Sequence, residues 1–144
     1  AYEARGIRVA SDTRGGPPFR PLRPDGTTST LVEVPSTLPT LDELLAFDAF
    51  RGERRDGVVD HFRRAVRQAE GISVHSVHTE IEGGRAFAGL FARQLEAWVE
   101  DGVSFVTLSD AAAGAGALPA RPLRFTAVRG RSVPVATGEP AGQS

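Results

Sequence analysis

The segment SVHSVHTEIEGG, residues 73–84, holds two of the three histidines of the chain. His75 and His78 lie three residues apart at the end of an apolar run, and Glu80 and Glu82 follow them. An imidazole at the carboxyl end of a strand can reach a ligand and act as a general acid. A strand-end histidine that is held by a loop carbonyl is the alternative interpretation of His78. Metal binding by the histidine pair is rejected, because alternation along a strand sends residues i and i+3 to opposite faces.

Asp12 and Arg14 are the next candidates for chemistry. Asp12 follows a predicted strand, residues 7–11, and stands directly before a glycine-rich loop. A carboxylate within reach of His78 would fix the tautomer of the imidazole and favour its charged form. Arg14 could hold a phosphate or carboxylate of a substrate. The alternatives are an Asx turn at Asp12 and a solvated loop arginine at position 14.

The remaining polar residues have plainer interpretations. Glu80 and Glu82 are either substrate contacts or carboxylates that suit the positive end of the following helix. His75, in mid-strand, is interpreted as a packed core histidine. His61 lies on the polar side of its predicted helix and is interpreted as a surface residue.

These residues are positioned by strands that alternate with helices along the sequence. Alternating or apolar runs predict strands at residues 7–11, 30–35, 72–78, 103–108 and 123–128. Helical spacing and capping signatures predict helices that follow Thr40, cover residues 58–69 and 85–101, and include a short one at 110–113 capped by Ser109. This order predicts an α/β fold with parallel strands, in which ligands meet the carboxyl ends of the strands. Asp12, His78, Ser109 and Asp110 occupy such positions.

Composition excludes several classes of function. The 144 residues suffice for one domain, and a formal net charge of −1 gives no bulk electrostatic argument for binding nucleic acid or membranes. The absence of cysteine excludes disulfides, thiolate catalysis and cysteine-ligated metals. No segment approaches the roughly 18 apolar residues of a membrane span. The first residues, AYEARGIRVASD, resemble a helix end that enters a strand, so we expect the chain to be the C-terminal part of a longer protein.

Several segments together resemble the carboxyl-terminal half of the NodB-homology polysaccharide deacetylases. They occur in this order: GIRVASDTRG, PPFRPL, EVPSTLPTLDELL, VHSVHTEIEGG and GVSFVTLSD. The parts SDTRG, PFRP, VPSTLPT and HTEIEG resemble the branch that deformylates undecaprenyl-phosphate-linked 4-deoxy-4-formamido-L-arabinose. Asp12 matches the aspartate of the fourth family motif, although the tryptophan often found there is absent. His78 matches the histidine of the fifth motif.

The resemblance implies a fold and a set of residue roles. It implies a partial (β/α) barrel over residues 1–128, with residues 129–144 as a loosely ordered tail. It implies hydrolysis of a linear amide, in which His78, held charged by Asp12, protonates the departing sugar nitrogen. Arg14 and Glu80 are the implied substrate contacts. A divalent metal such as zinc is implied for the whole family, but its ligands and the general base belong to motifs that this chain lacks.

The implied partners follow from that chemistry. The substrate is an N-acylated sugar, lipid-linked in the deformylase branch, and the missing N-terminal half of the barrel is the second partner. The expected location is the cytoplasmic face of the bacterial inner membrane or the cytoplasm, with the membrane surface reached through the substrate; no nucleic acid is expected. By itself the chain is expected to be inactive. The alternatives are a deacetylase of another N-acylated sugar and a non-catalytic, carbohydrate-binding half-barrel.

Overall fold

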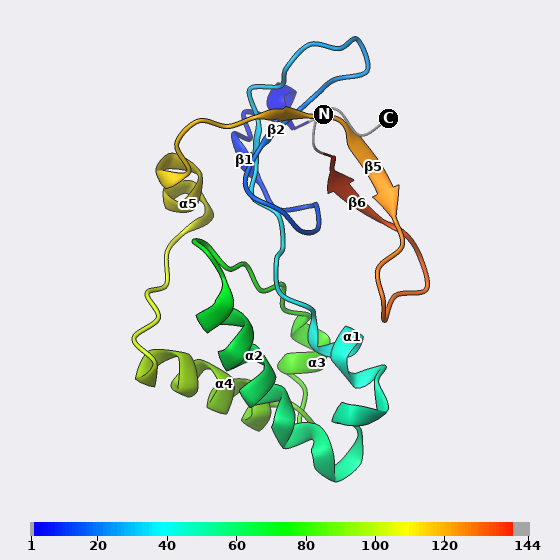
Figure 1. Cartoon of the computed structure of the whole chain (residues 1–144), viewed down its shortest axis with the longest axis vertical. Helices are drawn as coiled ribbons and strands as arrows, with labels where there is room; N and C mark the ends of the chain where they lie inside the picture. Colours follow the sequence, from blue (N-terminus) through cyan, green and yellow to red (C-terminus); the bar gives the residue numbers. More distant parts are fainter. Residues whose placement is uncertain (1, 140–144) are drawn as a thin grey trace. The chain divides into compact units, whose positions relative to one another are not determined.

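The computed structural model describes residues 2–139, which fall into two compact units (Figure 1). The first unit comprises Ala1–Thr37, Val106–Val128 and Val133–Ser144, and the second comprises Leu38–Phe105 and Arg129–Ser132. The first unit contains all the strands assigned to the described residues, and the second is helical. The chain is therefore mixed α/β.

Short parallel and antiparallel pairs form the first unit. β1 (Val9–Ala10) pairs in parallel with β3 (Val32–Glu33), and β2 (Arg20–Pro21) pairs in parallel with β4 (Ala120–Arg121). β5 (Leu123–Thr126) and β6 (Val135–Gly138) form an antiparallel pair. A 3₁₀ helix, η1 (Glu3–Arg5), precedes β1, and α5 (Leu108–Gly114) precedes β4.

The core of the first unit centres on one aromatic ring. Phe19 and Val34 are fully buried, and Leu31 and Val32, in and next to β3, are buried as well. Gly138 of β6 allows this packing, because a Cβ atom there would lie 2.6 Å from two atoms of the Phe19 ring. A larger residue at position 138 would therefore separate β6 from the ring.

The second unit consists of helices of different lengths. α1 (Leu41–Leu45) leads into the 3₁₀ helices η2 (Asp48–Phe50) and η3 (Gly52–Asp56), and then into α2 (Gly57–Gln68). α3 (Thr79–Glu82) and α4 (Ala88–Glu100) follow, and α2 packs beside α4 (Figure 1). The predicted helices at 58–69 and 85–101 are thus confirmed to within three residues at each end.

A single apolar cluster holds these helices together. It comprises Leu38, Leu41, Leu44, Val58, Phe62, Leu90 and Trp98. On α2 the buried residues are Val58 and Phe62, which lie one helical turn apart on the same face. On α4 the buried face includes Gln94 and Ala97, whereas Val99 is 64% exposed. At 100° per residue, positions 90, 94, 97 and 98 share one side of a helix, and position 99 lies away from it.

Two predicted strands are not confirmed. Residues 72–78 and 103–107 are assigned to no strand in the described part of the chain, and Leu108, the last residue of the strand predicted at 103–108, begins α5. Leu38 donates a backbone hydrogen bond to the Val74 carbonyl at 3.0 Å, but no strand is assigned to either residue. An alternating sequence favours an extended backbone, but a strand also requires a neighbour with free backbone groups in register.

Other boundaries differ from the predictions for local reasons. The short helix begins at Leu108, because the Thr107 hydroxyl, and not Ser109, accepts the Asp110 N–H at 3.1 Å. The strand at 123–128 is confirmed as β5, but part of the expected loose tail forms its partner β6. Residues 140–144 of that tail lie outside the described residues.

The sheets of the described residues do not close into a barrel. Each of the three has two strands, in the orders β1–β3, β2–β4 and β5–β6. Within residues 2–139, no helix combines the length and apolar character that crossing a membrane requires.

Candidate functional site

His78 lies at the beginning of α3, opposite a carboxylate from α1. It is the N-cap residue of α3, with an extended backbone, and its ring is half-buried. Its Nδ1 atom lies 3.7 Å from Oδ1 of Asp42, which is the separation of an ion pair when the ring is protonated. Because Nδ1 faces Asp42, Nε2 is the ring nitrogen that could give a proton to a ligand. The alternative interpretation placed a loop carbonyl beside the His78 ring. At Nδ1 the structure instead has the Asp42 carboxylate.

Asp42 is positioned by the first turn of α1. The predicted capping signature is confirmed: Thr40 is the N-cap residue, and its backbone N–H donates to the Glu43 carboxylate at 3.0 Å. Desolvation, the largest single influence on Asp42, raises its pKa. The Thr40 hydroxyl and the positive charges of His78 and Arg131 outweigh it, so the pKa of Asp42 is lowered overall. Asp42 is therefore held in its charged form, which is the form that attracts an imidazolium.

A second carboxylate, Glu82, supports the backbone of His78. Its side chain is 2% exposed, and its Oε2 atom accepts the His78 backbone N–H at 3.0 Å. Its other oxygen, Oε1, is buried and has no hydrogen-bond partner among the described residues. Glu80, the predicted substrate contact, is instead exposed, with the Thr79 hydroxyl 3.5 Å from its carboxylate. Glu82 thus fixes His78, while a substrate role for Glu80 stays a prediction.

A short loop, residues 129–131, completes this site from the distant end of the sequence. Nε of Arg131 donates to Oε1 of Glu43 at 2.5 Å, although 88 positions separate the two residues. The guanidinium of Arg129 lies 4.6 Å from the centre of the Phe47 ring, as a cation–π pair does. The segment expected to be a loose tail therefore supplies one contact to Glu43 of α1 and one to Phe47, two residues beyond the helix.

The other predicted site residues belong to the first unit. Asp12 is exposed, and the Tyr2 hydroxyl donates to its carboxylate; this bond and the charge of Asp12 raise the pKa of Tyr2. The Asp12 backbone N–H donates to the buried Glu33 carboxylate at 2.5 Å. Arg14 is half-buried, and its guanidinium lies 3.4 Å from the Ser36 hydroxyl. The prediction that Asp12 holds His78 joins residues of different units and stays a prediction.

The other histidines have structural surroundings. His75 packs against the core, with ring centres 4.6 Å from Phe62 and 5.8 Å from Trp98, and its Nδ1 is 3.1 Å from the Pro39 carbonyl. Its interpretation as a packed histidine is confirmed. His61 is half-buried and not a surface residue as predicted. Its ring lies edge-on to the ring of Phe50. Burial, and secondarily a neighbouring arginine, lowers the pKa of His61.

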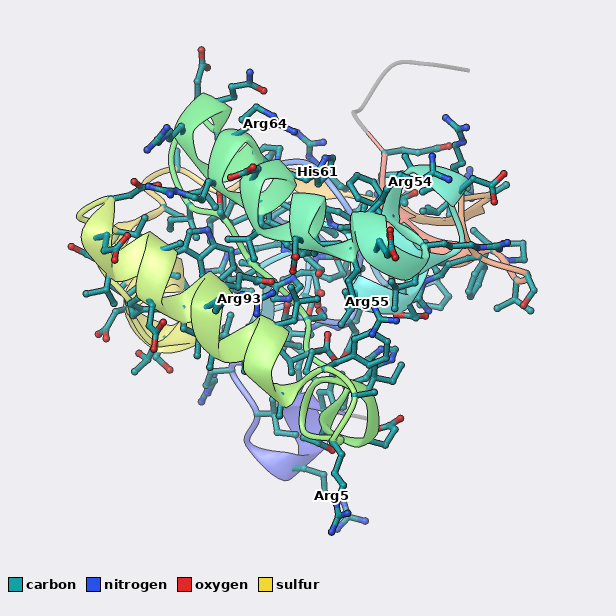
Figure 2. The ribbon with its side chains drawn as sticks, turned by 90° about the horizontal axis from the view of Figure 1, so that it is seen from below. Arg5, Arg54, Arg55, His61, Arg64 and Arg93 are labelled. Atoms are coloured by element: carbon teal, nitrogen blue, oxygen red, sulfur yellow. The ribbon has the colours of Figure 1, made fainter. Side chains whose placement is uncertain are left out.

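Arginines gather along η3, α2 and α4, where Figure 2 shows Arg54, Arg55, Arg64 and Arg93. Arg93 forms an ion pair with Asp56 at 2.5 Å, which joins α4 to η3. Arg55 lies over the Phe87 ring at 5.6 Å. These contacts tie neighbouring elements of the second unit together, so we interpret this arginine group as structural.

Sequence reasoning missed two members of the site around His78. Asp42 stands in the first turn of a capped helix, where an acidic residue has an ordinary structural explanation. Arg131 stands in a Gly- and Pro-containing segment with no periodic pattern. No local signal in the sequence connects either residue to His78.

Within residues 2–139, no three His, Cys, Asp or Glu side chains lie together so that they could hold an ion. A divalent metal remains an implication of the sequence resemblance alone.

A scan of the sequence against models of known protein families found no match.

Proposed function

We propose that this chain is the C-terminal part of a carbohydrate N-deacylase with a NodB-homology type of partial (β/α) barrel, and that it supplies the general acid. The sequence segments given above favour the deformylase branch, whose substrate is undecaprenyl-phosphate-linked 4-deoxy-4-formamido-L-arabinose. The observation that carries the proposal is the pairing of His78 with Asp42 at 3.7 Å, next to the buried Glu82.

The proposed step is the protonation of the departing nitrogen. In amide hydrolysis, water adds to the acyl carbon and the C–N bond then breaks. Without a proton, the sugar nitrogen would leave as an amide anion, which is too basic a leaving group. Nε2 of a protonated His78 donates that proton, and the ring becomes neutral as formate and the free amine are released. No residue of this chain is assigned to the activation of the attacking water.

Asp42 is the carboxylate that best fits the orienting role. Its first-turn position in α1 fixes it, and its lowered pKa keeps it charged down to acidic pH. A charged carboxylate at Nδ1 orients the ring so that Nε2 points away from it. Asp12 remains a second candidate for this role, and Arg14 a candidate contact to an anionic part of the substrate. With a lipid-linked substrate, the enzyme would act at the surface of a membrane.

The test uses the protein encoded by the complete reading frame and measures formate release from the 4-formamido sugar. We expect His78→Ala to reduce turnover by about 10²–10⁴-fold, the usual contribution of general acid catalysis, while the metal content stays unchanged. His61→Ala is the matched control, because His61 is half-buried in the same unit and contacts Phe50. It should leave turnover close to that of the wild type.

The outcomes separate the possible roles. Loss of metal together with activity in His78→Ala would make His78 a ligand and not the acid. Release of acetate from an N-acetyl sugar, without release of formate, would assign the chain to a deacetylase. Binding of the sugar without hydrolysis in the intact wild-type protein would leave only a carbohydrate-binding role.

A further inference from the structure

The 129–131 loop lies directly on the backbone of α1. Gly130 has φ = +92°, and a Cβ atom at this position would lie 2.9 Å from the Glu43 carbonyl oxygen and 3.2 Å from its Cα. Only a residue without a side chain fits both this conformation and this separation. The loop is thus fitted to the helix through its main chain as well as through its arginines.

Arg131 holds the first turn of α1 through a buried carboxylate. Glu43 is 1% exposed, and its two oxygens have different partners: Oε1 accepts from Nε of Arg131, and Oε2 accepts from the Thr40 backbone. The carboxylate therefore links the N-cap of the helix to the loop. Asp42 lies between these two fixed points of the turn, so its direction depends on both.

We propose that Arg131 is a positioning residue of the His78 site, which acts through Glu43 to keep the Asp42 carboxylate directed at His78. This inference deepens the proposed function, because it concerns the orientation of the same general acid. Arg131 is not a catalytic residue in this account. It fixes the turn from which Asp42 projects, and it adds a positive charge near that carboxylate.

The charged and polar groups around Asp42 determine how its pKa should respond when Arg131 is replaced. Thr40 and Glu43 belong to α1 and its cap, His78 and Glu82 to α3, and Arg131 to the loop. The charge of Arg131 contributes to the lowered pKa of Asp42. Replacing it with a neutral residue removes one positive charge and frees the turn to move away from His78. Both changes raise the pKa of Asp42.

The experiment is a pH titration of the whole chain by NMR, following the Asp42 side-chain carboxyl carbon and the His78 ring. We expect Arg131→Gln to move the Asp42 titration upwards and to change the His78 ring shifts. Arg131→Lys, which keeps the charge, should restore part of the wild-type behaviour. Arg124→Gln is the matched control, because Arg124 forms an exposed ion pair with Glu139 and its replacement should leave the Asp42 titration and the His78 ring shifts unchanged.

Gly130→Ala provides an independent test that keeps every charge. A side chain there displaces the loop from α1, so Asp42 and His78 should respond in the same direction as in Arg131→Gln. Trp98 fluorescence confirms that the second unit is folded in each variant. If Arg131→Gln is unfolded, Gly130→Ala tests whether the loop positions the Asp42 carboxylate. An unchanged Asp42 titration together with unchanged His78 ring shifts in the folded variants would overturn the proposal. These readouts do not involve turnover, so such a failure would leave the proposed function standing.

Discussion

Replacement of Glu33 tests whether one buried carboxylate fixes the loop that carries Asp12. Glu33 is 3% exposed, and its Oε1 atom accepts three hydrogen bonds. The donors are the Asp12 N–H at 2.5 Å, the Thr13 N–H at 2.8 Å and the Thr13 hydroxyl at 3.0 Å. Glu33→Ala removes all three bonds at once, whereas Glu33→Gln keeps an oxygen that can accept them.

The expected losses differ between the two variants. A hydrogen bond to a charged group contributes about 1.5–3 kcal/mol, and a buried donor left without a partner costs about 1–3 kcal/mol. Because the three bonds share one acceptor, their contributions do not add, and we expect Glu33→Ala to cost the first unit about 3–5 kcal/mol. Glu33→Gln loses only the contribution of the charge, about 1–2 kcal/mol. The larger loss is a sizeable fraction of the roughly 5–15 kcal/mol that stabilises a whole domain.

Amide hydrogen exchange in increasing urea is the appropriate assay. The single tryptophan, Trp98, lies in the second unit, so its fluorescence does not report directly on the first. In Glu33→Ala, the Asp12 and Thr13 amides should lose most of their protection, and exchange of the first unit should begin at lower urea. Glu53→Ala, at an exposed glutamate, is the control. A loss below about 1 kcal/mol with unchanged Thr13 protection would refute the reasoning, because it would mean that water or another group replaces the carboxylate at little cost.

Two further predictions concern the second unit. Phe62→Ala removes a ring that is 0% exposed and lies 6.1 Å from Trp98, so it should lower the free energy of unfolding by about 3–5 kcal/mol in urea titrations followed by Trp98 fluorescence. Val99→Ala, at a 64% exposed position of α4, should change the free energy of unfolding by less than about 0.5 kcal/mol. Equal losses of this free energy in Phe62→Ala and Val99→Ala would contradict the assigned core. Asp101 has a lowered pKa, chiefly through its hydrogen bond with Arg63, so its stabilising contribution is present above the unfolded pKa of about 3.9 and is lost as pH falls further. Asp101→Asn should therefore unfold at a lower urea concentration than the wild type at pH 6, and this difference in urea midpoint should become smaller towards pH 2. A difference that stays constant with pH would show that the ion pair does not cause it.

Features that depend on neighbouring residues followed from the sequence. The Thr40–Glu43 capping signature begins α1, and the spacing of Val58 and Phe62 defines the buried side of α2. His78 was found as a candidate because it ends an apolar run. In each case the signal lies within a few residues, which is the range over which helix caps and helical faces are decided.

Features that need two distant segments were decided by the tertiary structure alone. Residues 72–78 have the pattern of a strand, yet an extended backbone becomes a strand only where another segment offers hydrogen bonds in register. The partners of the site are equally remote: Asp42 comes from another helix, and Arg131 reaches Glu43 across 88 positions. A buried carboxylate needs a partner, but its local sequence does not say which arginine will be near it. The sequence by itself determined where the helices begin and which imidazole was available. Only the tertiary structure decided which charged residues lie around that imidazole, because electrostatic pairing depends on distance in space and not along the chain.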